Sequence, residues 1–237
     1  MKPVIIAAGT GCSSASAEHA CIRPVEAALH AAFPEYDVCR AYTSQRILER
    51  LKRQGEPADG IDEAVSRYKG RIACIASTHI IPGGEYEKLI AAAGNVPVSA
   101  PLLACEEDLR FMSGLLERIA AEENRALLVM GHGSDHAADE VYCRLTERLS
   151  DRVFLACMKG SLTLDSILPL LGPREITLMP LMLAAGGHAA RDLAGDHAFS
   201  WKSILAAAGF DVRVRMQGLG SFEEVQQRFV QKIRNVL

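Results

Sequence analysis

Short apolar runs alternate with longer amphipathic segments along the whole chain. The runs predict strands over residues 4–8, 36–42, 71–77, 96–100, 126–130, 152–157, 175–180 and 212–216. Most of them are continuously apolar, which is typical of strands in a sheet that is covered on both faces. Between them, apolar residues at three- and four-residue spacing predict helices, for example over 17–32, 104–121 and 222–236. This alternation predicts an α/β fold built on parallel sheet.

A weak internal repeat relates the two halves of the chain. Residues 5–11 (IIAAGTG) resemble residues 127–133 (LLVMGHG), each an apolar run followed by Gly-x-Gly. The Gly-Gly pairs at 83–84 and 186–187 also follow apolar strands and precede helices. We therefore expect two similar α/β domains, over 1–122 and 123–237, each with a parallel sheet flanked by helices.

Composition narrows the class of protein. The chain has 237 residues, of which 49% are hydrophobic and 23% are charged, values that are ordinary for a globular protein. A net charge of −3 and an aromatic content of 5% argue against a nucleic-acid partner or an anionic membrane. The longest uncharged stretch, between Glu175 and Arg191, is interrupted by proline and glycine, so no bilayer span is predicted.

Cysteine usage and the first residues bear on localisation. The seven cysteines are scattered and form no C-x-x-C pair, so neither a zinc knuckle nor a thioredoxin-type redox motif is indicated. Several lie in apolar runs, where free cysteine behaves as a small buried hydrophobe. The apolar run before Gly9 is too short for a signal sequence. These features predict a cytoplasmic protein.

The residues with chemical potential follow the predicted strands. In open α/β sheets ligands bind outside the carboxyl ends of the strands, so we expect these residues to line a cleft between the halves. They are Thr10, Gly11, His79, Glu85, His132, Lys159 and His188.

Two of these histidines lie in the same half of the repeat. His132 is in a Gly-His-Gly turn and His188 follows a Gly-Gly pair. Two converging imidazoles indicate either a transition-metal site or a general acid–base pair. His132 and His136 are an alternative pair for a zinc-dependent hydrolase. The sequence has no G-x-x-x-x-G-K-[ST] and no G-x-S-x-G motif, which argues against ATP-driven and serine-hydrolase chemistry.

Several motifs in one order resemble a known family. They are RAYTS at 40–44, HIIPGGEYEK at 79–88, MGHG at 130–133, LMPLML at 178–183, GHA at 187–189 and SWK at 200–202. The sequence resembles the small sirohydrochlorin cobaltochelatases of the CbiK type, which belong to the class II chelatases and act without ATP in the anaerobic cobalamin pathway. The resemblance implies a pseudo-twofold, two-domain fold in which the last helix packs back on the first domain.

The resemblance also implies roles for particular residues. His132 and His188 match the two histidines that bind the divalent metal, and Glu85 matches an acidic residue that faces the tetrapyrrole. The metal would be Co²⁺, with Fe²⁺ or Ni²⁺ as alternatives, and it is a substrate. Thr10, Gly11 and His79 are expected to contact the tetrapyrrole.

Lys159 departs from the family pattern, which usually has a glutamate there as the third metal ligand. A lysine ammonium has no lone pair and repels a divalent cation. Three explanations are open: Lys159 pairs with a substrate carboxylate, another carboxylate reaches the metal, or metal insertion has been lost. Other cations that flank the motifs are Arg40, Arg46, Arg191 and Lys202.

The function predicted from the sequence is ATP-independent insertion of Co²⁺ into sirohydrochlorin. The competing hypothesis, motivated by Lys159, is a non-catalytic protein that binds a tetrapyrrole or a metal on the same fold. Either protein needs no nucleic acid and no membrane, and an assembly of identical subunits is compatible with both.

Overall fold

The computed structural model describes residues 1–12, 14–172 and 174–237, which fold into two compact units. Unit 1 contains Met1–Leu102 together with Gly220–Leu237, and unit 2 contains Leu103–Leu219. The predicted ranges 1–122 and 123–237 differ from these units in the assignment of two helices. Helix α6 (Glu106–Glu123) is in unit 2 because it packs on strands of that unit, and helix α10 (Glu223–Arg234) is in unit 1 for the corresponding reason.

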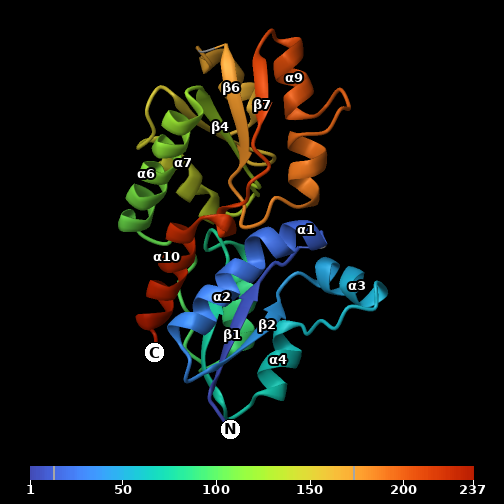
Figure 1. Ribbon diagram of the computed structural model, residues 1–237, viewed down its shortest axis with the longest axis vertical. Coiled ribbons are helices and arrows are strands. Elements are labelled where there is room, and N and C mark those ends of the chain that lie inside the picture. Colours follow the sequence, from blue (N-terminus) through green and yellow to red (C-terminus); the bar gives the residue numbers. More distant parts are fainter. Residues whose placement is uncertain (13, 173) are drawn as a thin grey trace. The chain divides into compact units, whose positions relative to one another are not determined.

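Unit 1 is a three-stranded parallel sheet with the strand order β2-β1-β3. Helices cover both of its faces (Figure 1). Its elements before α10 are β1 (Val4–Gly9), α1 (Ala15–Ala17), the π-helical turn η1 (Glu18–Ile22), α2 (Arg23–Ala32), β2 (Asp37–Tyr42), α3 (Gln45–Arg53), α4 (Ile61–Arg67), β3 (Ile72–Ser77) and α5 (Gly84–Ala93).

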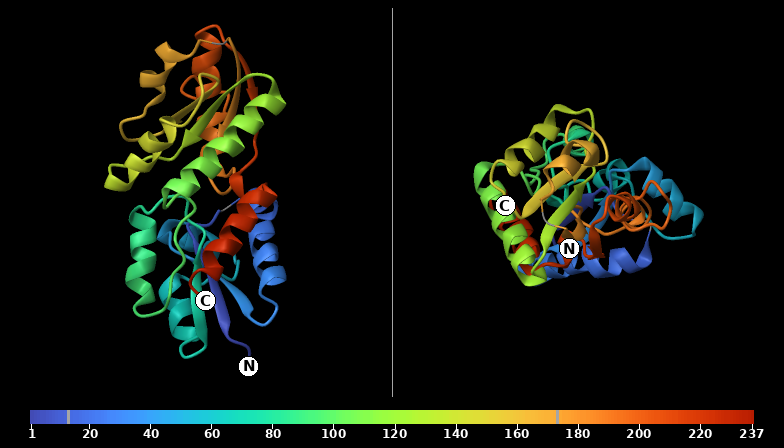
Figure 2. Two further views of the ribbon diagram at one scale, coloured as in Figure 1. Left: turned by 90° about the vertical axis from the view of Figure 1, so that its left-hand side faces the viewer. Right: turned by 90° about the horizontal axis from the view of Figure 1, so that it is seen from above.

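Alternate residues of β1 supply the two halves of the unit 1 core. Ile6 packs with residues of α4 and α5 on one face of the sheet. Ile5 packs on the other face with Leu29 of α2 and with Val230 and Ile233 of α10. Because successive side chains of a strand point to opposite faces, a central strand that is apolar throughout needs this double cover. Figure 2 shows α10, in red, beside α2, in blue.

One predicted strand and one predicted helix of unit 1 differ from expectation. Residues 96–100 form no strand, and only Val98 forms an isolated bridge, to Ile75. Pro97 lacks an N–H group for a ladder, although its carbonyl accepts from the N–H of Ile75. The helix predicted over 17–32 contains the π-helical turn η1 before Pro24. Pro24 has no backbone N–H, so it cannot donate a hydrogen bond to the preceding turn, and the regular α-helical pattern is interrupted there.

Unit 2 repeats the topology of unit 1 with one more strand. Its parallel sheet has the order β5-β4-β6-β7. After α6 its elements are β4 (Ala126–Gly131), the 3₁₀ turn η2 (Ala137–Asp139), α7 (Glu140–Thr146), β5 (Val153–Cys157), α8 (Leu164–Ile167), the 3₁₀ turn η3 (Leu168–Leu170), β6 (Glu175–Pro180), the π-helical turn η4 (Ala189–Leu193), α9 (Trp201–Ala207) and β7 (Asp211–Val214). A further 3₁₀ turn, η5 (Leu219–Ser221), spans the passage back to unit 1.

Helices cover both faces of the unit 2 sheet as well. Leu128 and Met130 of β4 pack with Trp201 and Leu205 of α9 and with residues of α8. Helices α6 and α7 contact β4 and β5 (Figure 1). The two units thus share one parallel α/β architecture, as the repeat predicts. In the described part of the chain, no helix combines the length and the apolar character that crossing a membrane requires.

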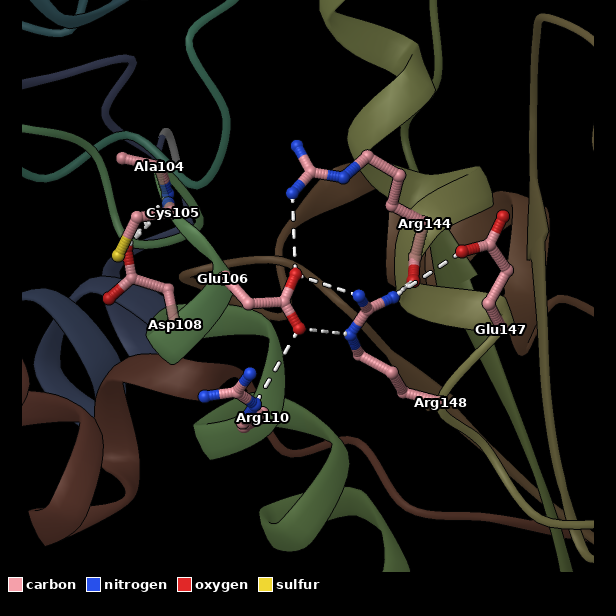
Figure 3. Close-up of polar contacts among 8 residues, drawn as sticks. All are labelled: Ala104, Cys105, Glu106, Asp108, Arg110, Arg144, Glu147 and Arg148. Atoms are coloured by element: carbon pink, nitrogen blue, oxygen red, sulfur yellow. Dashed lines mark hydrogen bonds and ion pairs between the residues drawn. The ribbon is translucent and has the colours of Figure 1, made fainter.

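Several ion pairs share the carboxylate of Glu106, in the first turn of α6 (Figure 3). Glu106 lies between three arginines in this view, one from its own helix and two from α7 and its C-terminal end. Its carboxylate accepts from Nε of Arg148 at 2.8 Å and from a terminal nitrogen of the same guanidinium at 2.7 Å. Arg144 contributes a bond of 3.4 Å and Arg110 an ion pair of 3.6 Å. The hydrogen bonds from Arg148 hold the pKa of Glu106 below its ordinary value.

Candidate functional site

His132 lies in the turn directly after β4. Its Nδ1 is 2.8 Å from the carbonyl oxygen of Gly133. A carbonyl can only accept, so the proton of the neutral imidazole is on Nδ1 and the lone pair is on Nε2. Gly133 has a φ of +65°, and a Cβ there would clash with the carbonyl of Lys159. The turn therefore requires glycine next to the histidine.

His188 lies just before η4, in the loops that follow β6. Its Nδ1 is 2.7 Å from Oδ2 of Asp192, one helical turn later. Hydrogen bonds from Arg191 at 2.8 and 2.9 Å hold the pKa of Asp192 below its ordinary value, so this carboxylate is an acceptor. His188 therefore carries its proton on Nδ1 and, like His132, has its lone pair on Nε2.

The two imidazoles lie together. Their ring centroids are 5.2 Å apart and the ring planes meet at 86°. β4 and β6 are neighbouring parallel strands, so the loops at their carboxyl ends share one edge of the sheet. No group of three or more histidine, cysteine or acidic side chains with metal-binding geometry occurs among the residues that the structure describes. The two imidazoles thus form a donor set in which neither Nε2 has a hydrogen-bond partner in the described part of the chain.

The backbone of Lys159 lies beside the turn that carries His132. The N–H of Met158 donates to the carbonyl of Gly131 at 3.1 Å, and the carbonyl of Lys159 lies against Gly133. Its side chain is exposed, and within the described ranges it forms no hydrogen bond or ion pair. An uncompensated ammonium therefore lies on the loop next to His132.

His136 has a local structural role. Its Nδ1 accepts a hydrogen bond from the N–H of Ala138 at 3.0 Å and caps the turn η2. In the neutral ring the proton is then on Nε2, which leaves no lone pair for a metal. The geometry does not favour His132 and His136 as a zinc-binding pair.

In unit 1 the predicted residues lie at the carboxyl edge of the sheet. Thr10 is exposed directly after β1. Gly11 has a φ of +82°, and a Cβ there would lie 3.2 Å from Ile47 of α3 and closer still to the ring of Tyr42. The chain can turn at this point only because Gly11 has no side chain.

His79 is buried and hydrogen-bonded at both ring nitrogens. Nδ1 is 3.0 Å from the hydroxyl of Ser77, and Nε2 is 3.1 Å from the hydroxyl of Thr43. Ser77 ends β3 and Thr43 follows β2, the two strands on either side of β1. Burial lowers the pKa of His79 to about 4. A neutral imidazole therefore connects the two outer strands across the end of the central one.

Glu85 lies near the start of α5, and its two carboxylate oxygens have different surroundings. Oε1 accepts from the Lys88 ammonium at 2.6 Å. Oε2 is shielded from solvent and has no hydrogen-bond partner among the described residues. An unpaired, solvent-shielded carboxylate oxygen is unusual and is typical of a functional position.

Asp192 is a candidate site residue that the sequence motifs did not single out. The signal was the spacing of His188 and Asp192, because residues four apart meet on one face of a helical turn. Conversely, three of the four cations that flank the motifs are engaged within the protein. Arg40 binds Glu26 at 2.5 and 2.6 Å, Arg191 binds Asp192, and Lys202 binds Asp196 at 2.5 Å.

The fold and these loops define a class of protein. It has two open parallel α/β units with chemically active loops at the carboxyl edges of their sheets. Among solved structures, the chain is similar to DR2241 from Deinococcus radiodurans, a multi-domain protein described as structurally similar to chelatases. The TM-score is 0.59 at 15% identity, and the match covers 98% of this chain and 54% of that one. The chain therefore shares the fold of the matched part of this protein.

The sequence comparisons identify the family. The chain belongs to the cobalt chelatase (CbiK) family, whose model matches residues 3–237. It is 34% identical over 212 residues to the sirohydrochlorin cobaltochelatase CbiKC of Nitratidesulfovibrio vulgaris, covering 81% of this chain and 75% of that protein. It is 29% identical over 260 residues to the sirohydrochlorin cobaltochelatase of Salmonella typhimurium, covering 100% and 97%. The family predicted from the sequence motifs is confirmed.

Proposed function

We propose that this protein inserts Co²⁺ into sirohydrochlorin without ATP, as a step of cobalamin biosynthesis. The family membership and the names of the two relatives support the reaction and the substrate. The supporting observation within the site is the pair His132 and His188. Their Nδ1 atoms bind acceptors and their Nε2 lone pairs are free, with rings 5.2 Å apart.

Neutral imidazoles suit the delivery of a divalent transition metal. They bind cobalt, nickel and iron ions, and two of them hold the ion less tightly than a closed four-ligand site would. During insertion the ion leaves the imidazoles for the ring nitrogens, and the macrocycle loses two pyrrole protons. Each imidazole that releases the metal regains a basic nitrogen able to accept one of these protons. The balance is one metal dication in and two protons out.

For unit 1 we propose contacts with the tetrapyrrole from Thr10, Gly11 and Glu85. The unpaired Oε2 of Glu85 is a further acceptor for a pyrrole proton. His79 is too buried to touch a substrate, and both of its nitrogens are bonded. Its role is therefore to position the loop between β3 and α5, which carries Glu85.

We propose that the Lys159 ammonium contacts a carboxylate of the substrate. It is exposed beside His132, and sirohydrochlorin carries many acetate and propionate groups. The same lysine is also the specific reason to retain a second candidate, a non-catalytic protein that binds a tetrapyrrole or a metal. A cation next to the imidazole pair opposes the binding of Co²⁺.

An anaerobic absorbance time course tests the proposal. Protein in substoichiometric amount is mixed with sirohydrochlorin and Co²⁺, with no ATP present, and compared with the uncatalysed reaction. Conversion beyond one equivalent is expected. A spectrum that changes and then saturates at one equivalent would replace the enzyme with the binding protein. Parallel runs with Fe²⁺ and Ni²⁺ measure the metal preference.

Variants test the assigned roles. His132→Ala and His188→Ala are each expected to abolish insertion while circular dichroism remains that of the wild type. His136→Ala, a change in the same loop as His132, is the matched control and is expected to retain turnover. Lys159→Gln is expected to raise the KM for sirohydrochlorin more than it lowers kcat. Undiminished turnover in either His132→Ala or His188→Ala contradicts the metal-binding roles.

A cytoplasmic location is part of the same proposal. All seven cysteines are free thiols, which is compatible with a reducing cytoplasm. Analytical ultracentrifugation measures whether identical chains of this protein assemble into an oligomer.

A further inference from the structure

Helix α3 carries three arginines in one row. Arg46, Arg50 and Arg53 are spaced by four and three residues, so they lie on one face of the helix. Leu48 and Leu51 occupy the opposite side and pack against Tyr42 in the core. The arginine side chains line a surface hollow of about 400 Å³ together with Gln54.

The row is not neutralised by the protein. Over residues 1–12, 14–172 and 174–237 no carboxylate forms an ion pair with any of the three guanidinium groups, and Arg53 makes one long bond, of 3.4 Å, to the carbonyl of Glu49. Lys52 of the same helix is different, because it pairs with Glu63 at 2.9 Å. Three uncompensated positive charges on one helix face are notable in a chain with a net charge of −3. Such a cluster attracts a ligand with several negative charges.

The row lies at the edge of the sheet where ligands bind. Helix α3 begins two residues after the carboxyl end of β2, with Ser44 as its N-cap. Ile47 on the same helix packs against Gly11 in the loop after β1. The charge of Arg50 also acts on the thiol of Cys12 in that loop, where it partly opposes the rise in pKa that burial causes. Helix α3 thus borders the loop that contains Thr10 and Gly11 through Ile47, and Arg50 is close enough for its charge to act on Cys12.

We propose that Arg46, Arg50 and Arg53 form a binding subsite for the peripheral carboxylates of a polycarboxylated tetrapyrrole. The inference rests on the proposed function for the identity of the macrocycle. A guanidinium group binds a carboxylate through two parallel hydrogen bonds, which an ammonium cannot do. From Arg46 to Arg53 the helix rises by about 10 Å, so the row binds several carboxylates spread along one edge of a macrocycle.

The test measures tetrapyrrole binding in the absence of metal. Full-length protein is titrated with sirohydrochlorin, anaerobically, and with uroporphyrin, a porphyrin that carries only acetate and propionate side chains. Each of Arg46→Gln, Arg50→Gln and Arg53→Gln is expected to weaken binding by about two- to fivefold, and the triple variant by about tenfold or more. The loss shrinks as ionic strength rises, because salt screens exposed charges. The same variants raise the KM for insertion more than they lower kcat.

A triple variant of unit 1 with the same change in net charge is the control. Lys52→Gln, Arg67→Gln and Lys69→Gln together remove three exposed cations outside the row, and this variant is expected to bind within twofold of the wild type. If the arginine variant binds like the wild type, or the control loses as much affinity, the subsite is overturned. A wild type that binds neither tetrapyrrole overturns it as well. A wild type that binds sirohydrochlorin through the row but inserts no metal leaves the subsite standing and removes the chelatase function.

Discussion

We propose that Asp192 determines which nitrogen of His188 binds a metal. Its Oδ2 accepts a hydrogen bond from Nδ1 of His188 at 2.7 Å, and hydrogen bonds from Arg191 favour its ionised form. A carboxylate partner also raises the basicity of the ligating imidazole.

Asp192→Asn is therefore expected to weaken Co²⁺ binding by about 10- to 100-fold, because the ionised acceptor is lost. Isothermal titration calorimetry of the wild type and the variant measures the effect. Asp196→Asn is the control: it removes a neighbouring carboxylate that is 96% exposed and pairs only with Lys202 in the described chain. Equal affinities for the wild type and Asp192→Asn would show that Asp192 does not orient His188.

His79 predicts a pH dependence of stability. Its pKa is about 4 in the folded protein and about 6.5 when exposed. Between these values the unfolded chain binds a proton that the folded protein does not. The free energy of unfolding therefore falls as the pH drops from about 6.5 to about 4, by up to on the order of 3 kcal/mol.

Urea denaturation at several pH values tests this dependence. His79→Gln cannot gain the proton, so its free energy of unfolding is expected to change less over the same pH range. His30→Gln, at an exposed position on α2, serves as control and is expected to keep the slope of the wild type. Identical slopes for the wild type and His79→Gln would contradict the assignment.

At the scale of an element, α6 depends on one buried carboxylate. Asp108 accepts from the backbone N–H groups of Ala104 at 2.9 Å and Cys105 at 3.1 Å, just before the first turn. These donors have no partner within the helix, so the carboxylate replaces the bonds that a helix start lacks. The Asp108 side chain is fully buried, although Ala104 and Cys105 themselves are exposed.

Asp108→Ala is expected to lower the free energy of unfolding by about 1–2 kcal/mol, because two backbone donors at the start of the helix lose their acceptor. Chemical denaturation measures the loss. Glu122→Ala removes an exposed carboxylate paired with Arg118 near the other end of the helix, and should cost less than about 1 kcal/mol. A loss for Asp108→Ala no larger than that of Glu122→Ala would show that the cap is not needed.

At the scale of the whole molecule, the final helix completes the first unit. Phe229, Val230 and Ile233 of α10 are buried, and the last two pack with β1 and α2 in the core of unit 1. The histidine pair, Asp192 and Lys159 belong entirely to unit 2. Stability of the first unit and the metal binding that we propose for the second therefore depend on different parts of the chain.

Phe229→Ala is expected to destabilise the protein by about 3–5 kcal/mol through the cavity that it creates. Under native conditions the Co²⁺ affinity of the histidine pair should stay within twofold of the wild type. Thermal unfolding and calorimetric titration give the two values, with Gln227→Ala as an exposed control on the same helix. A variant that loses Co²⁺ binding while still folded would contradict this separation.

The sequence by itself determined the α/β class, the repeated parallel topology and the family. These properties are encoded locally, in runs of apolar residues and in Gly-containing turns that recur in both halves. Seven of the eight predicted strands are present in the described chain. The strand predicted over 96–100 does not form, and Pro97 in its middle has no N–H group for a ladder.

The tertiary structure was needed to assign α6 to unit 2, because helix packing partners are not encoded in helix periodicity, whereas the resemblance already implied that the last helix packs on the first domain. The tertiary structure also decided the state of each imidazole. His79, His132, His136 and His188 all follow predicted strands, yet the first is buried between two hydroxyls and the third caps a turn. Among the described residues, His132 and His188 lie close together and each has an Nε2 without a hydrogen-bond partner. The partners that set their protons, Gly133 and Asp192, are near in sequence. The approach of His132 to His188, and the bond between Thr43 and His79, join residues distant in sequence, which meet only when the chain has folded.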